Sequence, residues 1–251
     1  MTARGTLRRL DVQGHFLAWR SDALALSALI SLAVLIKWKW FFGDVCWANY
    51  QDNTNLFLPV FSAISARLAS GDIPICLPGI LGGLRLDTCP HFHIFYPFYF
   101  LYLNVFPSPL QCAILVHRII LFHYLLLAAN TYALGRILNF RPPSAVVAAL
   151  TFASSVAVQS EMSWVTILSA TTWLPLVLGG LQLILVGKPR IGICLLTASA
   201  ILLVLAQPGQ QVIIASVSCA LLLLGHLIMS RNSLGDVRKT IFSILLALLC
   251  I

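Results

Sequence analysis

The stretch SDALALSALISLAVLIKWKWFF, Ser21–Phe42, joins a long apolar run to a segment in which Lys and Trp alternate. A helix needs about 20 mostly apolar residues to cross the roughly 30 Å hydrocarbon core of a bilayer. Lys and Trp directly after such a run are typical of the membrane–water interface. No small-residue cleavage site follows, and further apolar runs come later, which favours a retained membrane helix over a signal peptide. The sequence therefore predicts a first membrane helix over 21–42.

The composition of the whole chain agrees with this interpretation. Of its 251 residues, 59% are hydrophobic and only 10% are charged, and the mean hydropathy is +0.92. Soluble domains are about half apolar and a quarter charged. We therefore expect an all-α integral membrane protein, a bundle of about seven transmembrane helices, here placed near 21–42, 110–134, 145–160, 164–186, 191–206, 211–229 and from 240 onward. The two runs that flank VQSEMSW, 158–164, also fit one re-entrant hairpin.

The basic residues predict an orientation. Under alternating threading, eleven of the sixteen Lys and Arg fall on one side: Arg4, Arg8, Arg9, Arg20, Arg136, Arg141, Lys188, Arg190, Arg231, Arg238 and Lys239. Loops rich in Lys and Arg face the cytoplasm, so segment 1–20 is expected on the cytoplasmic side of the cytoplasmic (inner) membrane, and 21–251 is expected to form the polytopic membrane domain. Five of the eight acids then lie outside: Asp44, Asp52, Asp72, Asp87 and Glu161. Such dispersed basic residues argue against a nucleic-acid partner.

One long outer loop, about 43–109, separates the first two predicted helices. Its part from Asn55 to Ser70 carries Pro59 near its start and apolar residues at helical spacing, and Gly71 follows as a stop. We expect an amphipathic helix on the outer membrane surface. The aromatic-rich stretch HFHIFYPFYFLYLNVF, 91–106, fits an interfacial belt or a platform for a sugar or a polyprenyl chain. Three cysteines share the loop as free thiols or with one disulfide: Cys46, Cys76 and Cys89.

Seven short motifs follow one another along the chain: GD, QDNTNLFLPVF, SGDIP, GILGG, IFYPFYFL, TTWLPLVL and LAQPGQQ. In this order, over about 42–211, the chain resembles the YfhO family of bacterial membrane proteins, which is similar to the GT-C glycosyltransferases. The resemblance implies an enzyme that transfers a sugar from a polyprenyl-phosphate donor to a glycan acceptor outside the cytoplasmic membrane. GT-C proteins usually have more helices, so this chain is expected to be the N-terminal part of a longer protein. The segment PICLPG and Gln207 depart from residues common in the family.

The candidate catalytic residues are Asp52 and Asp44, which follow the first helix. A carboxylate at the membrane boundary has the raised basicity that a general base needs, and the resemblance implies the same location. One acid would act as the base and the other as its partner or as a ligand of a divalent cation. The alternatives are a solvated turn acid for Asp44 and a helix N-cap for Asp52. The cofactor and metal requirement stay open.

Four further residues are candidates for substrate binding. Arg118 lies inside the second predicted helix. A cation within a membrane is energetically costly, so Arg118 is a functional candidate that would bind a lipid phosphate. The alternative is that it snorkels to the interface or pairs with an acid. Glu161, the single Glu of the chain, lies in a short outer turn, where it would line the same cavity as Arg118 or be a solvated turn residue. Gln207 and Gln210, with Gln211 beside them, offer amides to sugar hydroxyls or simply form a polar turn. His117 and His123 either join Arg118 or bond to a neighbouring helix.

The competing function is a transporter or flippase-like protein, or a structural polytopic membrane protein, without covalent chemistry. Secondary transporters carry internal repeats and paired broken helices, and neither is expected from this sequence. The acid-rich outer loop favours the transferase.

Overall fold

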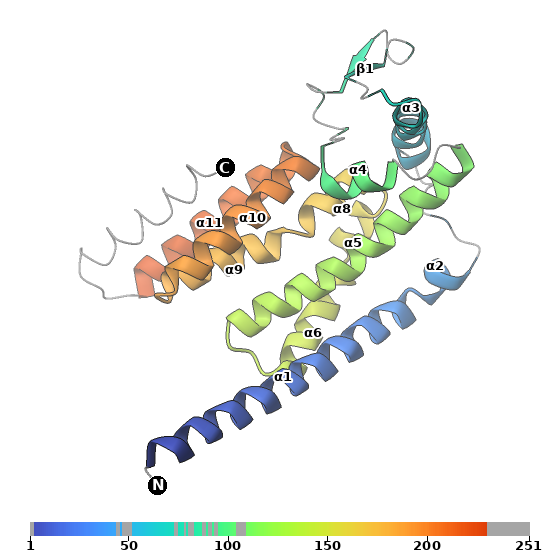
Figure 1. The fold of residues 1–251 in the computed structure, drawn as a ribbon. Helices are drawn as coiled ribbons and strands as arrows, with labels where there is room; N and C mark the ends of the chain where they lie inside the picture. Colours follow the sequence, from blue (N-terminus) through green and yellow to red (C-terminus); the bar gives the residue numbers. More distant parts are fainter. Residues whose placement is uncertain are drawn as a thin grey trace.

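A computed structural model describes residues 3–43, 46, 52–72, 75–77, 79, 83–86, 89, 92, 95–103 and 109–229. Long helices lie side by side in a bundle, and the described elements between residues 52 and 103 lie over one end of it (Figure 1). The bundle helices are α1 (Ala3–Ile36), α2 (Trp38–Phe42), α5 (Pro109–Ile137), α6 (Pro142–Ala153), α7 (Val156–Glu161), α8 (Val165–Thr171), α9 (Leu174–Leu185), α10 (Pro189–Ala206) and α11 (Gln210–Met229).

The predicted class, an all-α membrane bundle, is confirmed. Four segments are long and apolar enough to cross a membrane: Trp19–Ile36, Gln111–Ile137, Val165–Leu185 and Pro189–Ala206. Two shorter apolar helices, Pro142–Ala153 and Gln210–His226, accompany them. Three of the predicted helices, 110–134, 191–206 and 211–229, agree closely with α5, α10 and α11. The helix predicted from 240 onward lies outside the described residues.

The first predicted helix, 21–42, differs from the structure at both ends. α1 begins at Ala3, so residues 3–20 continue into the first span as one helix. At Lys37 the backbone leaves helical geometry (φ −107°, ψ 21°), and α2 begins at the next residue. Trp38 is 54% exposed, as an interfacial anchor requires, but Lys37 is only 8% exposed. Lys37 is thus covered by the protein, and its place at the membrane–water interface stays a prediction.

The helix predicted over 145–160 is also wrong, because the chain breaks after Ala153. Ser155 has extended backbone geometry, and its side chain accepts a hydrogen bond from the Val158 N–H, which caps α7. α6 is left with 12 residues, about 18 Å at 1.5 Å per residue, too short to cross the hydrocarbon core. α7 instead joins α8 through the turn 162–164, as in the hairpin alternative.

The span 164–186 is confirmed in its limits but is broken between α8 and α9. Pro175, in the first turn of α9, has no N–H to continue the hydrogen-bond ladder. Asn130 of α5 donates to the Thr172 carbonyl at 2.8 Å, and the Thr172 hydroxyl donates to the Leu168 carbonyl at 2.8 Å. The Thr172 carbonyl at the break is thus satisfied inside the bundle, as a membrane interior demands. The described residues thus contain a broken helix, and the absence of internal repeats and of paired broken helices stays a prediction.

The segment between α2 and α5 has its own small structure. It contains a π-helical turn, η2 (Asn53–Phe57), then α3 (Leu58–Ala69), a two-stranded antiparallel ladder of β1 (Cys76–Leu77) and β2 (Leu84–Arg85), and α4 (Pro97–Leu103). The predicted amphipathic helix is confirmed: α3 buries Val60, Phe61 and Ile64, and Gly71 follows it with φ +84°. Its place on a membrane surface stays a prediction. Cys46, Cys76 and Cys89 are free thiols.

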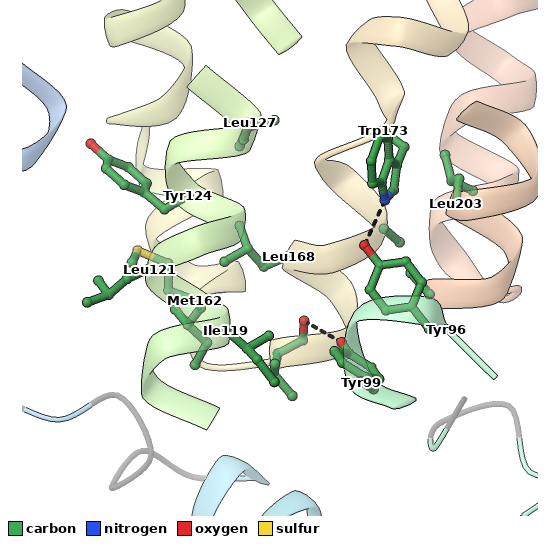
Figure 2. Packing of buried hydrophobic residues seen from close by; sticks show 14 of the residues in the cluster. Tyr96, Tyr99, Ile119, Leu121, Tyr124, Leu127, Met162, Leu168, Trp173 and Leu203 are labelled. Atoms are coloured by element: carbon green, nitrogen blue, oxygen red, sulfur yellow. Dashed lines mark hydrogen bonds between the residues drawn. The ribbon is translucent and has the colours of Figure 1, made fainter. Parts of the chain in front are cut away.

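A buried aromatic and polar cluster connects α4, α5 and the α8–α9 break (Figure 2). The Trp173 indole N–H donates to the Tyr96 hydroxyl at 2.9 Å, and Tyr96 donates to His123 Nε2 at 2.8 Å. His123 Nδ1 donates to the Ile119 carbonyl at 2.8 Å, which leaves Nε2 as the acceptor. The Tyr99 hydroxyl donates to Ser169 Oγ at 2.7 Å. These bonds fix Tyr96 and Tyr99 of the aromatic-rich stretch against the bundle.

Candidate functional site

A polar pocket of about 640 Å³ lies where α7, α8 and the α10–α11 connection meet. We call this end of the bundle, which also carries η2 and α3, the loop end. Its lining includes three of the predicted binding residues, Glu161, Gln207 and Gln210, together with Trp164 and Thr166. The volume falls in the range of about 300–1,000 Å³ that is usual for small-molecule sites. The packing of the helices therefore joins residues that lie in two separate stretches of sequence.

Glu161 ends α7, and its carboxylate is only partly satisfied. Oε1 accepts a hydrogen bond from Gln211 Nε2 at 3.3 Å. Oε2 is buried, as is the Thr171 hydroxyl, and neither has a hydrogen-bond partner among the described residues. Burial raises the pKa of the Glu161 carboxyl; the nearby Thr171 hydroxyl and Gln211 amide offset part of this rise. A buried carboxylate oxygen with a free lone pair and a raised pKa is suited to accept a proton.

The predicted catalytic acid Asp52 is followed by Asn53, whose side chain contacts the turn after Glu161. Asn53, fully buried, donates from Nδ2 to the Met162 carbonyl at 3.2 Å, and its Oδ1 accepts from the Val165 N–H at 3.2 Å. Val165 is the first residue of α8, so Asn53 caps that helix from a distant segment. Asp52 itself is half-buried and forms no side-chain cap bond to η2. The capping alternative is thus not found for Asp52, and Asp44 lies outside the described residues.

Asn53→Ala is expected to destabilise the loop end markedly. The substitution leaves the Met162 carbonyl and the Val165 N–H without their partner, and each buried unsatisfied group costs about 1–3 kcal/mol. The matched control is Asn55→Ala in the same π-helical turn, where the side chain is exposed and a change within about 0.5 kcal/mol is expected. Thermal unfolding of both variants in detergent measures the difference. Equal midpoints would show that Asn53 does not hold the turn.

The remaining candidates lie away from the pocket. Arg118 is exposed on α5 and is not among the residues that line the pocket, and the two histidines follow the alternative in which they bond to neighbouring elements. His117 Nε2 lies 2.9 Å from the Trp40 carbonyl, and His123 bonds Tyr96 as described above. Lys37 donates to Gln159 Oε1 on α7, and burial lowers the pKa of its amine. Lys37 thereby ties the end of α1 to the helix that carries Glu161.

Three residues of the site were not singled out from the sequence: Asn53, Trp164 and Thr166. Asn53 adjoins a candidate acid and Trp164 follows Glu161 by three positions, so proximity along the chain was the available signal. Thr166 gave none. Within the described ranges, no group of three His, Cys, Asp or Glu side chains is arranged to hold a metal ion.

Comparisons of the chain with protein-family models, with characterised proteins and with solved structures find no match. The resemblance to the YfhO family therefore rests on the seven sequence motifs alone. The function has to be argued from the pocket.

Proposed function

We propose that this membrane protein is a GT-C-like glycosyltransferase that takes a sugar from a polyprenyl-phosphate donor and transfers it to a glycan acceptor at the loop end. The observation that carries the proposal is the polar pocket, in which a partly buried carboxylate, glutamine amides and an indole meet. Amides recognise sugar hydroxyls by hydrogen bonds, and an aromatic ring supplies apolar contact area. The proposal places the loop end outside the cytoplasmic membrane and the N-terminus inside, in keeping with the distribution of basic residues.

The chemistry needs one base. Transfer breaks the bond between the anomeric carbon and the phosphate oxygen, and polyprenyl phosphate leaves with the electron pair. A new bond forms between the anomeric carbon and the acceptor oxygen, and the hydroxyl proton passes to a carboxylate. Glu161 is our first choice for this base, because it lines the pocket and has a free lone pair. Asp52 is the second choice, because it is next to Asn53, which contacts the same turn. Asp44 is retained as a partner acid. Arg118 is retained as a phosphate ligand, although it does not line the pocket.

Asp52→Asn separates a catalytic role from a structural one. If Asp52 is the base or its essential partner, sugar transfer in membrane vesicles falls by about 10²–10⁴, the usual cost of losing a general base. The measurement is incorporation of radiolabel from a polyprenyl-phosphate sugar into acceptor glycan, at matched expression. Asn is isosteric and caps helices as well as Asp does, so a structural role predicts unchanged transfer. Full transfer by this variant would leave Glu161 as the base.

The broken span α8–α9 supports one second candidate, a transporter of a polar lipid. Discontinuous helices line substrate sites in many transporters, and the α8 part of this span, which contributes Thr166, borders the pocket. The same vesicle experiment distinguishes the two functions. Labelled donor that crosses the bilayer with its sugar still attached to the lipid would establish transport and refute transfer.

A further inference from the structure

A second pocket, of about 360 Å³, lies between α9, α10 and α11. Its lining is almost entirely aliphatic and includes Leu181, Leu196, Leu203, Ala215, Cys219 and Ala220. Ser216 is the one hydroxyl in it, and that hydroxyl donates to the Val212 carbonyl of its own helix at 2.8 Å. The lining therefore offers no free hydrogen-bond donor to a polar ligand. Apolar cavities of this kind exclude water and accept hydrocarbon.

The linings of the apolar and the polar pocket come from neighbouring positions of α10 and α11. Leu203, near the end of α10, lines the apolar pocket, and Gln207, directly after that helix, lines the polar one. At the start of α11, Gln210 lines the polar pocket and Val212 the apolar one. Each pair is separated by at most about one helical turn, roughly 6 Å. Gln211, which bonds Glu161, lies one turn before Ala215 on the same face of α11. A polar site and an apolar site are therefore stacked along one pair of helices.

We propose that the two pockets form one site for a single amphiphile, with a hydroxyl-rich head beside Glu161 and the first part of its hydrocarbon chain between α9, α10 and α11. This inference rests on the proposed function and assigns the donor chain a place in it. Bulk lipid could fill the apolar pocket, but bulk lipid would not need a polar pocket at the end of that groove. The pair of pockets therefore fits one ligand with a polar head and an apolar chain. The aligned pockets fit a lipid-linked sugar better than a free sugar or a plain fatty chain.

Two natural cysteines allow a direct test. Cys219 lines the apolar pocket, whereas Cys194, also on a bundle helix, is exposed and not among the residues that line it. In proteoliposomes, octyl glucoside below its micellar concentration is expected to slow the reaction of Cys219 with N-ethylmaleimide several-fold and to leave Cys194 unchanged. Glucose alone and octanol alone should protect far less. Gln210→Leu should weaken the protection by octyl glucoside, because the head loses an amide partner.

Three outcomes would overturn the inference. Equal slowing of both cysteines would indicate a general effect on the bilayer. Equal protection by octanol would show a chain site unconnected to the polar pocket. A Cys219 that is unreactive with and without the probe would show that another segment of the chain already fills the groove.

Ala220→Trp separates this inference from the proposed function. The indole would occupy the apolar pocket, so the KM for a polyprenyl-phosphate sugar should rise by about tenfold, since overpacking and loss of chain contacts act together. Transfer that proceeds with an unchanged KM, without protection of Cys219, refutes the chain site and leaves the transferase standing. Protection of Cys219 in a protein that transfers no sugar refutes the transferase and leaves the amphiphile site standing.

Discussion

Glu161→Gln is expected to reduce sugar transfer by about 10²–10⁴ and, at neutral pH, to raise the temperature at which the protein unfolds. The loss of transfer follows from the loss of the base. The gain in stability follows from the partly buried carboxylate, whose Oε2 lacks a partner while the Thr171 hydroxyl also lacks one. Gln would place a neutral amide there, without the charge that burial penalises, and would keep the acceptor for Gln211. Relief of a buried unsatisfied group is on the order of 1 kcal/mol.

The sign of the pH dependence follows from the direction of the shift. Burial raises the pKa of Glu161 in the folded state above its ordinary value of 4.5, so the folded protein binds the proton more tightly than the unfolded chain. The ionised carboxylate therefore destabilises the fold at a pH above the raised pKa. The stabilisation by Glu161→Gln should be largest there and should shrink as the pH falls toward 4.5. Thermal unfolding of both proteins across this range measures it.

Asp72→Asn provides the matched control for Glu161→Gln, because Asp72 is an exposed acid that follows α3. The same acid-to-amide change there should alter neither transfer nor the unfolding temperature by a measurable amount. A Glu161→Gln protein that transfers sugar at the normal rate would refute Glu161 as the base. A destabilised variant would show that the ionised carboxylate supports the fold.

Gly192→Leu is expected to prevent normal folding of the bundle. A Cβ at Gly192 would lie 2.7 Å from the Gly180 carbonyl oxygen and 2.8 Å from the Ile184 backbone nitrogen, and one at Gly180 would lie 2.5 Å from the Leu196 nitrogen. These are backbone atoms that cannot rotate away. Close approach through small residues is a usual way for membrane helices to pack, and overpacking alone costs about 1–3 kcal/mol. Because α10 leads into Gln207, its displacement should also open the polar pocket.

The control is Gly225→Leu on α11, where an added Cβ meets no atom within 4 Å. Leu is a better helix former than Gly, so this variant should be unchanged or slightly stabilised. Fluorescence-detected size-exclusion chromatography compares the fraction of each protein that elutes as a single folded species. A Gly192→Leu protein that elutes like the Gly225→Leu protein would show that α9 and α10 can separate without loss of the fold.

The helices of this protein were predictable wherever the deciding signal was local. A continuous apolar run of sufficient length requires a helix in a bilayer, because every backbone N–H and C=O must be satisfied within the segment. This condition alone located α5, α10 and α11 within a few residues. The same holds for α3, where helical spacing of apolar residues, an early Pro59 and a following Gly71 all agree. The sequence by itself therefore determined the class and most of the spans.

The breaks depended on partners that no local pattern reveals. Ser154 and Ser155 fit inside a helix as well as at its end, and only the fold shows that the Ser155 side chain caps α7. The break before α9 is tolerated because Asn130, 42 residues away, reaches the Thr172 carbonyl. Lys37 bonds Gln159, 122 residues later, and its place beside Trp38 in the sequence does not predict this partner. Such contacts follow from helix packing, which apolar periodicity does not specify.

The candidate site, too, was predictable only in part from the sequence. The sequence singled out Glu161, Gln207 and Gln210, because acids and amides are scarce in an apolar chain and costly to place within it. It did not show that they share one pocket, nor that Asn53 would cap α8 beside them. Composition determines which polar residues need an explanation. Only the tertiary structure decided which of them meet, since the packing of α7 and α8 against the α10–α11 connection brings together side chains about 50 residues apart.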